Sequence, residues 1–385
     1  MDAILKCSLD SIKWNKNQSL QFLCQQTHDN VKRAAESILA GKVVGFPTET
    51  VYGLGANAFN EEAVRSIFKA KGRPNDNPLI VHVSSTHMLN KYFSQQLPWT
   101  YERLIKEFWP GPLTILIKSP TDLPGETTAH LDTVGVRMPS HPVARALIEC
   151  SGVPLAAPSA NSSGRPSTTS AVHVFEDVYQ RTEAREVMNY ILDGGRSDIG
   201  LESTVVDGLS DVGKVRVLRP GGVTIEALKK VVGDDNVLYD KTQTKGEDFK
   251  PTTPGMKYKH YSPTAKVVLI MSRGGDKEDK TERLQELIRS LGTDTKIGCM
   301  TLQDSCITKG LLKINERTDQ LIPYFVGPSS QPSVVASNIF AGLHALDKEA
   351  VEYILVEGVD EAEEGLAIMN RLCKAAGNAE SIVMI

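Results

Sequence analysis

The chain has 385 residues, of which 41% are hydrophobic and 23% charged, and it carries a formal net charge of −4. This composition is typical of a soluble globular protein, and the length suggests two domains or three. The acidic balance disfavours a general polyanion-binding protein. The sequence contains no run of eighteen apolar residues, so it predicts no membrane span.

The cysteines show no CxxC pair, which predicts reduced thiols rather than a zinc site or a disulfide framework. They are Cys7, Cys24, Cys150, Cys299, Cys306 and Cys373. Residues 1–30 are expected to form an N-terminal extension before the fold begins. The extension lacks the basic start and long apolar stretch of a secretory signal, but its basic and hydroxyl residues leave organelle targeting open. We therefore expect a cytoplasmic protein and leave open a mitochondrial pool.

Residues 31–232 are expected to form one domain in which apolar strands alternate with amphipathic helices. Asn60 is the expected N-cap of one helix, and Pro142 opens another. The mixed order of elements predicts an α/β (α+β) domain built on a twisted mixed sheet. The expected strands are residues 42–46, 78–83, 113–117, 134–138, 155–157, 190–192, 204–206 and 215–218, and the expected helices are 61–70, 101–108, 142–150 and 224–232.

Residues 233–263 have the polar, proline-containing composition of a linker. The segment ends in PGMKYKHYSP, a mixture of aromatic, cationic and histidine residues that a simple tether does not need. Residues 264–385 return to alternating elements, with strands expected at 266–271, 297–301 and 353–356 and helices at 281–291 and 334–345. This alternation predicts a small Rossmann-like parallel α/β domain.

The stretch PTETVYGLGANA, residues 47–58, places Thr48, Glu49 and Thr50 in a turn directly after a strand. Hydroxyls and a carboxylate at the carboxyl end of a strand are well placed to contact a ligand. Taken alone, however, a tight turn whose hydroxyls bond their own backbone is the simpler interpretation.

The stretch KAKGRPNDNP concentrates Lys69, Lys71 and Arg73 at the end of a predicted helix. Interaction with the helix dipole explains one cation there better than three. Pro74 and Pro78 stiffen the loop that follows, which favours a preorganised clamp for an anion such as phosphate. His82, in the next strand, is more typical of a structural residue than of a ligand.

Three further stretches carry candidate residues. Arg137 lies within a short apolar strand and needs a partner, either a buried ion pair or the carboxylate of a ligand. The hydroxyl-rich loop PSANSSGRPS could line a nucleotide pocket, and Arg219 before a glycine turn is another phosphate candidate. No Walker A sequence is present, so any nucleotide must bind without a P-loop.

Together, the stretches FPTETVYGLG, KAKGRPNDNPLIVHV, WPGPLTIL, VGVRMPSHP, APSANSSGRPS, GLESTVVD and VRVLRPGG closely resemble the Sua5/YrdC/YwlC family. Members of this family are threonylcarbamoyl-AMP synthases, which are nucleotidyltransferases. They condense L-threonine, bicarbonate and ATP to threonylcarbamoyl-adenylate and pyrophosphate, for N6-threonylcarbamoyladenosine formation at position 37 of tRNAs that read codons beginning with A. The resemblance implies a YrdC-like catalytic domain, and the linker and tail resemble the longer Sua5 branch.

The resemblance also implies roles for particular residues. The expected threonine-binding residues are Thr50, His82, Thr133, Arg137, Ala157 (through its backbone) and Ser203. The expected ATP-binding residues are Lys71, Arg73, Asn77, Ser159, Asn161, Ser167 and Arg219. Lys71 and Arg73 are expected to be catalytic by stabilising charge on the phosphates. His260 and Tyr261 are expected to belong to a lid that keeps water from the labile product.

The resemblance further implies that Mg²⁺ arrives with ATP rather than at a dedicated protein site. The partners implied are these small molecules, downstream proteins that use the adenylate, and a weak tRNA contact, with no membrane. A competing hypothesis is a double-stranded RNA or tRNA-binding module without chemistry. The acidic net charge and the aromatic content of 6% speak against that hypothesis.

Overall fold

The structure is a computed structural model that describes residues 3–15, 19–75, 77–240, 260–272, 280–292, 294–316 and 318–385. The chain divides into two compact units. The first unit is Met1–Ser163, Ser167–Asp198 and Glu202–Lys257, and the second is Gly164–Pro166, Ile199–Leu201 and Tyr258–Ile385. Two short loops, residues 164–166 and 199–201, therefore belong to the second unit although they lie far from it in the sequence. Most of the expected linker, residues 241–259, falls outside the described residues.

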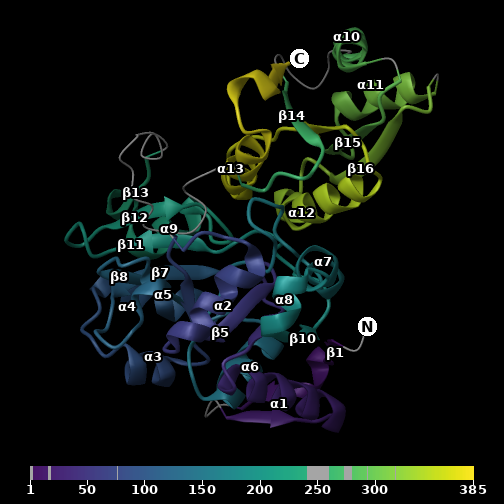
Figure 1. The fold of residues 1–385 in the computed structure, drawn as a ribbon. Helices are drawn as coiled ribbons and strands as arrows, with labels where there is room; N and C mark the ends of the chain where they lie inside the picture. The colour runs from purple at the N-terminus through teal and green to yellow at the C-terminus, as the bar shows by residue number, and fades with distance from the viewer. Residues whose placement is uncertain are drawn as a thin grey trace. The chain divides into compact units, whose positions relative to one another are not determined.

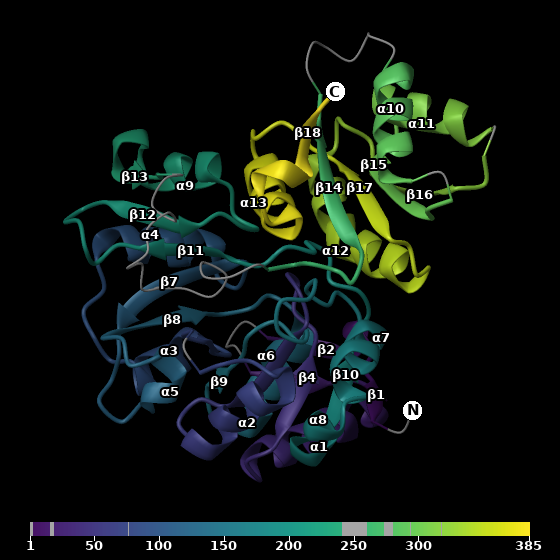
Figure 2. The same ribbon diagram turned by 45° about the horizontal axis from the view of Figure 1, so that its top comes forward.

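The first unit is built on a mixed sheet that runs from β1, beside the N-terminus, to β13 (Figures 1 and 2). Parallel and antiparallel pairs alternate irregularly across it, which confirms the predicted α/β class with a twisted mixed sheet. Among the described residues the strand order is β1 (Ile4–Lys6), β10 (Met188–Asp193), β4 (Val43–Phe46), β5 (Gly53–Asn57), β9 (Leu155–Ala156), β6 (Ile80–His82), β8 (Thr133–Arg137), β7 (Leu113–Lys118), β11 (Thr204–Asp207), β12 (Val215–Arg219) and β13 (Val237–Leu238).

Helices pack on this sheet through apolar stripes. The sequence explains their ends: the Asn60 side chain accepts a hydrogen bond from the Ala63 N–H at 3.0 Å, and Gly72 ends the same helix with a φ of 60°. The helices of the first unit are α1 (Gln25–Leu39), α2 (Glu61–Lys71), α3 (Thr86–Tyr92), α4 (Trp99–Phe108), α5 (Gly125–Thr128), α6 (Pro142–Ser151), α7 (Ala171–Val174), α8 (Thr182–Val187) and α9 (Ile225–Val232).

The described residues among the first thirty take part in the fold of the first unit. Strand β1 pairs in parallel with β10 at the edge of the large sheet, so these residues extend the sheet rather than precede it. Strands β2 (Ile12–Trp14) and β3 (Leu20–Phe22) form a separate antiparallel pair. The expected extension therefore supplies one edge of the first unit.

The second unit has a parallel sheet, as the alternation of elements predicts. The order of its described strands is β16 (Leu321–Gly327), β15 (Ile297–Leu302), β17 (Tyr353–Glu357), β14 (Lys266–Met271) and β18 (Ile382–Met384). Helix α10 (Thr281–Leu291) packs with α11 (Cys306–Asn315), and α12 (Pro332–Lys348) packs with α13 (Glu364–Ala376) (Figure 2). Two helix pairs of this kind are expected when helices cover both faces of a parallel sheet. No helix in the described parts of either unit has the length and apolar character required to cross a bilayer.

Candidate active site

Several of the predicted site residues lie at the ends of neighbouring strands of the first unit. His82 is the last residue of β6 and Arg137 is the last residue of β8; the two strands are parallel, and these residues are paired directly across the ladder. Ala157 follows β9 directly, and its N–H donates to the Ile80 carbonyl at 2.9 Å. The sheet thus places His82 and Arg137 side by side, and it places Ala157 opposite Ile80, two residues before His82 on β6.

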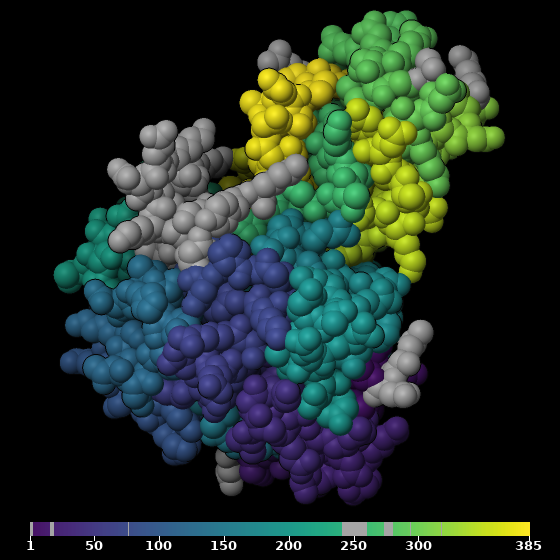
Figure 3. All heavy atoms as spheres, viewed as in Figure 1, coloured from purple at the N-terminus to yellow at the C-terminus, as the bar shows by residue number. Residues whose placement is uncertain are grey.

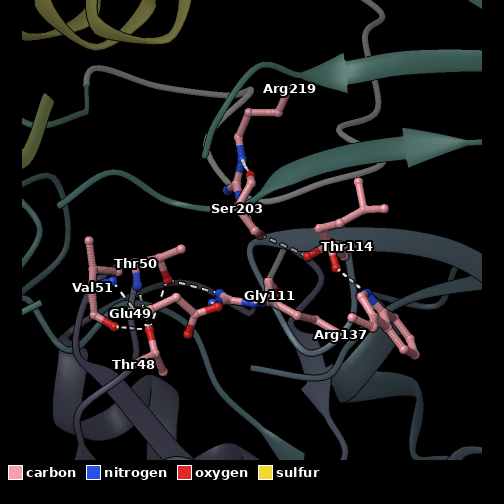
Figure 4. Close-up of polar contacts among 11 residues, drawn as sticks. Thr48, Glu49, Thr50, Val51, Gly111, Thr114, Arg137, Ser203 and Arg219 are labelled. Carbon is pink, nitrogen blue, oxygen red and sulfur yellow. Dashed lines mark hydrogen bonds and ion pairs between the residues drawn. The ribbon is translucent and has the colours of Figure 1, made fainter. Parts of the chain in front are cut away.

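Arg137 forms a buried ion pair with Glu49, one of the two kinds of partner that the sequence leaves open. Its Nη2 lies 2.6 Å from Oε1 of Glu49, its Nη1 donates to Thr50 Oγ1 at 2.9 Å, and its Nε donates to the Gly111 carbonyl at 3.1 Å (Figure 4). Glu49 and Arg137 are only 5% and 3% exposed. Sequence reasoning placed Glu49 in a turn but did not name it as a site residue; its position directly before Thr50 was the available signal.

The turn that carries Glu49 is held by its own hydroxyls. Thr48 Oγ1 accepts the Val51 N–H at 3.2 Å and lies 2.8 Å from Thr50 Oγ1. This agrees with the simpler interpretation of the turn, yet the same arrangement directs Thr50 Oγ1 at the Arg137 guanidinium (Figure 4). The hydroxyl bonds of the turn and the contact to Arg137 are therefore parts of one structure.

His82 is buried beside this cluster. Its Nδ1 lies 3.2 Å from the Ile80 carbonyl oxygen, and its ring meets the Phe46 ring edge-to-face with 6.1 Å between centroids. A carbonyl oxygen only accepts, so the ring proton lies on Nδ1. Burial, with a smaller contribution from the Arg137 charge, lowers the pKa of His82 from 6.5 to about 3. His82 is therefore a neutral imidazole throughout the physiological range.

Ser203 and Arg219 form a second pair. Arg219 Nη2 donates to the Ser203 carbonyl at 2.8 Å and to Ser203 Oγ at 3.2 Å, and Ser203 Oγ lies 2.8 Å from Thr114 Oγ1 (Figure 4). The structure thus joins a residue expected near threonine to one expected near ATP, and adds Thr114, which the sequence did not indicate. Thr133 opens β8 and lies at its other end from Arg137, roughly 13 Å along the strand.

The cationic stretch at the end of α2 meets the hydroxyl-rich loop. Lys71 is 2% exposed, and its Nζ donates to the carbonyl oxygens of Ser159 and Asn161. Burial, then the nearby Arg73 charge, lowers the pKa of Lys71 well below its usual range. Lys69 instead turns outward to Glu186 of α8, with 2.6 Å between Nζ and Oε2, and the surfaces of α2 and α8 adjoin in Figure 3.

Of the remaining predicted ATP residues, Ser159 and Asn161 lie at this contact. Ser159 Oγ donates to the Asn161 side-chain oxygen, Ser167 Oγ donates to Glu202 Oε1 at 2.5 Å, and Asn77 is buried. Two separated motifs, KGR and SAN, are therefore joined directly by Lys71.

The two clusters lie along one stretch of paired backbone. The Leu54 N–H donates to the Pro158 carbonyl at 2.9 Å, the Ala160 N–H donates to the Tyr52 carbonyl at 2.8 Å, and Gly53 and Ser159 form an antiparallel bridge. The segment that carries Thr50 thus runs beside the loop that carries Ser159. The cluster around Arg137 and the cluster around Lys71 therefore lie next to each other in the first unit.

His260 and Tyr261, the expected lid residues, are the first residues that the structure describes after the gap at 241–259. Tyr261 is buried in the second unit, where its ring lies 5.2 Å from the Phe340 ring and 6.0 Å from the Arg371 guanidinium. The His260 ring lies beside it, with 5.7 Å between ring centroids. A lid role for this pair stays a prediction.

Comparison with known proteins defines the class to which this fold and site belong. A family model for Sua5, YciO and YrdC proteins, described as "Telomere recombination", matches residues 36–221. A second model, described as "Threonylcarbamoyl-AMP synthase, C-terminal domain", matches residues 223–377. The protein therefore has the two-part architecture of the longer members of this class.

Individual relatives make the assignment more specific. The threonylcarbamoyl-AMP synthase of Pyrococcus abyssi is 43% identical over 350 residues, which cover 90% of this chain and 94% of the relative. That of Bacillus subtilis is 41% identical over 354 residues, covering 90% and 93%. The crystal structure of P. abyssi Sua5 complexed with L-threonine matches 99% of both chains with a TM-score of 0.80 and 39% identity. The chain belongs to the threonylcarbamoyl-AMP synthase family, an enzyme family, as the sequence motifs predict.

Proposed function

We propose that the first unit condenses L-threonine, bicarbonate and ATP to threonylcarbamoyl-adenylate and pyrophosphate. The observation that carries this proposal is the placement of the Arg137 cluster beside the Lys71 cluster, through the pairing of residues 52–54 with 158–160. One cluster has the chemistry to bind the carboxylate of an amino acid, and the other has the chemistry to bind phosphates. A threonine complex of a relative that matches the whole chain supports the same assignment.

The chemistry that these residues support is positioning and charge stabilisation rather than covalent catalysis. Arg137 would receive the threonine carboxylate, with Thr50, His82 and Ser203 around the rest of the amino acid. The threonine nitrogen would attack the carbon of bicarbonate, and an oxygen of the resulting carbamate would attack the α-phosphorus of ATP while pyrophosphate leaves. Holding the reactants together lowers the entropic part of the barrier.

Lys71 and Arg73 would stabilise the negative charge that develops on the phosphates. Lys71 is already held by two backbone carbonyls, so it would act without a large rearrangement. Mg²⁺ typically binds through substrate phosphates and few carboxylates. We therefore propose that Mg²⁺ enters with the triphosphate, where it would neutralise charge on the leaving pyrophosphate.

The product would be passed to downstream proteins that transfer the threonylcarbamoyl group to adenosine 37 of tRNA, with at most a weak tRNA contact by this chain. The six cysteines, all of them among the described residues, form no disulfide, as in proteins of reducing compartments. A cytoplasmic location and a mitochondrial pool both stay predictions.

The test is incubation of the purified chain with ATP, L-threonine and labelled bicarbonate. We expect pyrophosphate release that requires both threonine and bicarbonate, together with a labelled adenylate detected by mass spectrometry. Pyrophosphate release that is indifferent to threonine would contradict the proposal. Absence of release, together with tight RNA binding that weakens steeply with salt, would favour the RNA-binding hypothesis instead.

A further inference from the structure

The carboxylate of Glu49 is the feature of the site that the proposed function does not explain. It is buried, its Oε1 lies 2.6 Å from Arg137 Nη2, and neither of its oxygens makes a hydrogen bond of standard geometry to any residue that the structure describes. An ionised carboxylate offers about four acceptor positions. Buried polar atoms are nearly always hydrogen-bonded, so an exception calls for a ligand, a water or a functional reason.

The charges around Glu49 restrict what can bind there. Arg137 is the cation that it contacts, His82 on β6 is neutral, and His141 before α6 also lies close enough to feel the Glu49 charge. Burial lowers the pKa of His141, and the Glu49 charge partly opposes this shift. The buried group of Glu49 and Arg137 is therefore neutral as it stands.

A substrate carboxylate added to Arg137 would give this buried group a net negative charge, which is costly in a desolvated site. Threonine carries its ammonium group on the carbon that bears the carboxylate. With the carboxylate on the Arg137 guanidinium, the ammonium therefore comes within reach of Glu49, which touches the same guanidinium. Two anions and two cations then alternate, and the group is neutral again.

We propose that Glu49 binds the α-ammonium group of threonine and accepts its proton. This inference rests on the proposed function, because it takes Arg137 as the binding site of the threonine carboxylate. In this inference Glu49 is a catalytic residue. In a purely structural role, Glu49 would only neutralise the charge of Arg137.

The protons and the bonds of carbamate formation balance as follows. The ammonium gives one proton to the Glu49 carboxylate, and the nitrogen lone pair that is freed forms the C–N bond to bicarbonate. The hydroxyl of bicarbonate leaves as water and takes the second nitrogen proton, so the product is the carbamate. The proton on Glu49 returns to solvent before the next turnover. Only bicarbonate, which the proposed reaction already supplies, is required.

The first test uses the unaltered protein. Calorimetry compares L-threonine with its α-hydroxy analogue, in which a hydroxyl replaces the ammonium group and the carboxylate and side chain are unchanged. A charged hydrogen bond in a buried site predicts a Kd for the analogue that is about 10- to 100-fold higher. Equal Kd values would overturn the inference while leaving the threonine site intact. Binding of neither compound would instead contradict the proposed function.

The second test uses Glu49→Gln, which keeps the shape of the side chain and removes its charge. We expect the preference for threonine over the analogue to fall to about threefold or less, and kcat to fall at least 100-fold at neutral pH. Because the variant must use threonine whose amine is already neutral, its kcat/KM for threonine should rise about tenfold per pH unit below the ammonium pKa. The wild type should be nearly flat over the same range.

Two controls separate this role from a structural one. Glu49→Asp retains a proton acceptor and should restore the flat pH profile at a reduced rate. Asp347→Asn removes a carboxylate that pairs with Arg165 in the second unit, with 2.7 Å between the charged atoms, and should leave the preference for the ammonium unchanged. If Glu49→Gln keeps both the wild-type pH profile and the wild-type preference, Glu49 only neutralises Arg137.

Discussion

His82 should make the first unit lose stability as the pH falls. Its folded-state pKa of about 3 lies below the value of 6.5 for an exposed histidine, because the ring is buried and close to Arg137. Between these two values the unfolded chain binds a proton that the folded chain does not. Stability is therefore fully present above pH 6.5 and is lost progressively as the pH falls toward 3.

The size of this effect follows from the shift. Each pH unit below 6.5 costs about 1.4 kcal/mol, so at pH 5 the His82 contribution to the free energy of unfolding should have fallen by about 2 kcal/mol. In His82→Gln this contribution is absent. The difference in unfolding free energy between the variant and the wild type should therefore change by about 2 kcal/mol between pH 7.5 and pH 5, in favour of the variant.

Urea unfolding followed by tryptophan fluorescence is a suitable assay. The three tryptophans of the chain, Trp14, Trp99 and Trp109, all lie in the first unit, so their emission reports its unfolding. His87→Gln changes an exposed histidine near the same strand and should keep the wild-type pH dependence. Parallel pH dependences for the wild type and His82→Gln would refute the reasoning, because they would mean that the folded His82 ring takes up a proton as readily as an exposed one.

Three other substitutions test the site and the second unit. Arg137→Ala should raise the KM for threonine at least 100-fold while changing that for ATP less than threefold, in steady-state kinetics; equal effects would remove Arg137 from the carboxylate. Arg73→Ala should lower kcat at least 100-fold, measured by pyrophosphate release, with unchanged threonine affinity; a lost threonine affinity would move Arg73 out of the phosphate site. Asp347→Asn should destabilise the second unit by about 1–3 kcal/mol. Besides its ion pair with Arg165, Asp347 accepts hydrogen bonds from the N–H groups of Thr264 and Ala265 at 2.7 and 3.1 Å. Calorimetric unfolding measures the change, and an unchanged transition of the second unit would contradict the prediction.

Much of the fold could be predicted because most strands are short apolar runs. The strand at β5 was missed for a physical reason: its sequence GLGAN has a low β propensity. The structure needs glycine there because the Phe46 ring occupies the space, and a Cβ on Gly53 or Gly55 would lie 2.8 or 2.6 Å from ring atoms. Tertiary packing thus overrides local preference in this strand. Helix α1 was missed because its stripe includes small residues, Ala34 and Ala35, beside Val31 and Ile38.

The site shows a similar division. The sequence indicated that Arg137 needs a partner, because charge in an apolar strand is costly. It could not identify Glu49, since that pairing depends on how the turn after β4 meets the end of β8, across 87 positions between Thr50 and Arg137. Likewise, the KGR motif predicted a cation near phosphates. Only the structure places Lys71 against the carbonyls of Ser159 and Asn161.

The way in which Lys71 is held bears on how the site attracts its substrate. Backbone carbonyls satisfy the hydrogen bonds of an ammonium group but carry no net charge, and the negative charges that act on Lys71 come from Asp177 and Glu202. Arg137 is held in part by the Gly111 carbonyl and in part by Glu49, whose charge does cancel its own. Under the proposed function, the triphosphate would therefore bind where Lys71 and Arg73 lie together, with Mg²⁺ neutralising part of its charge. Threonine would bind at Arg137 as a zwitterion, which adds no net charge to the neutral pair of Glu49 and Arg137.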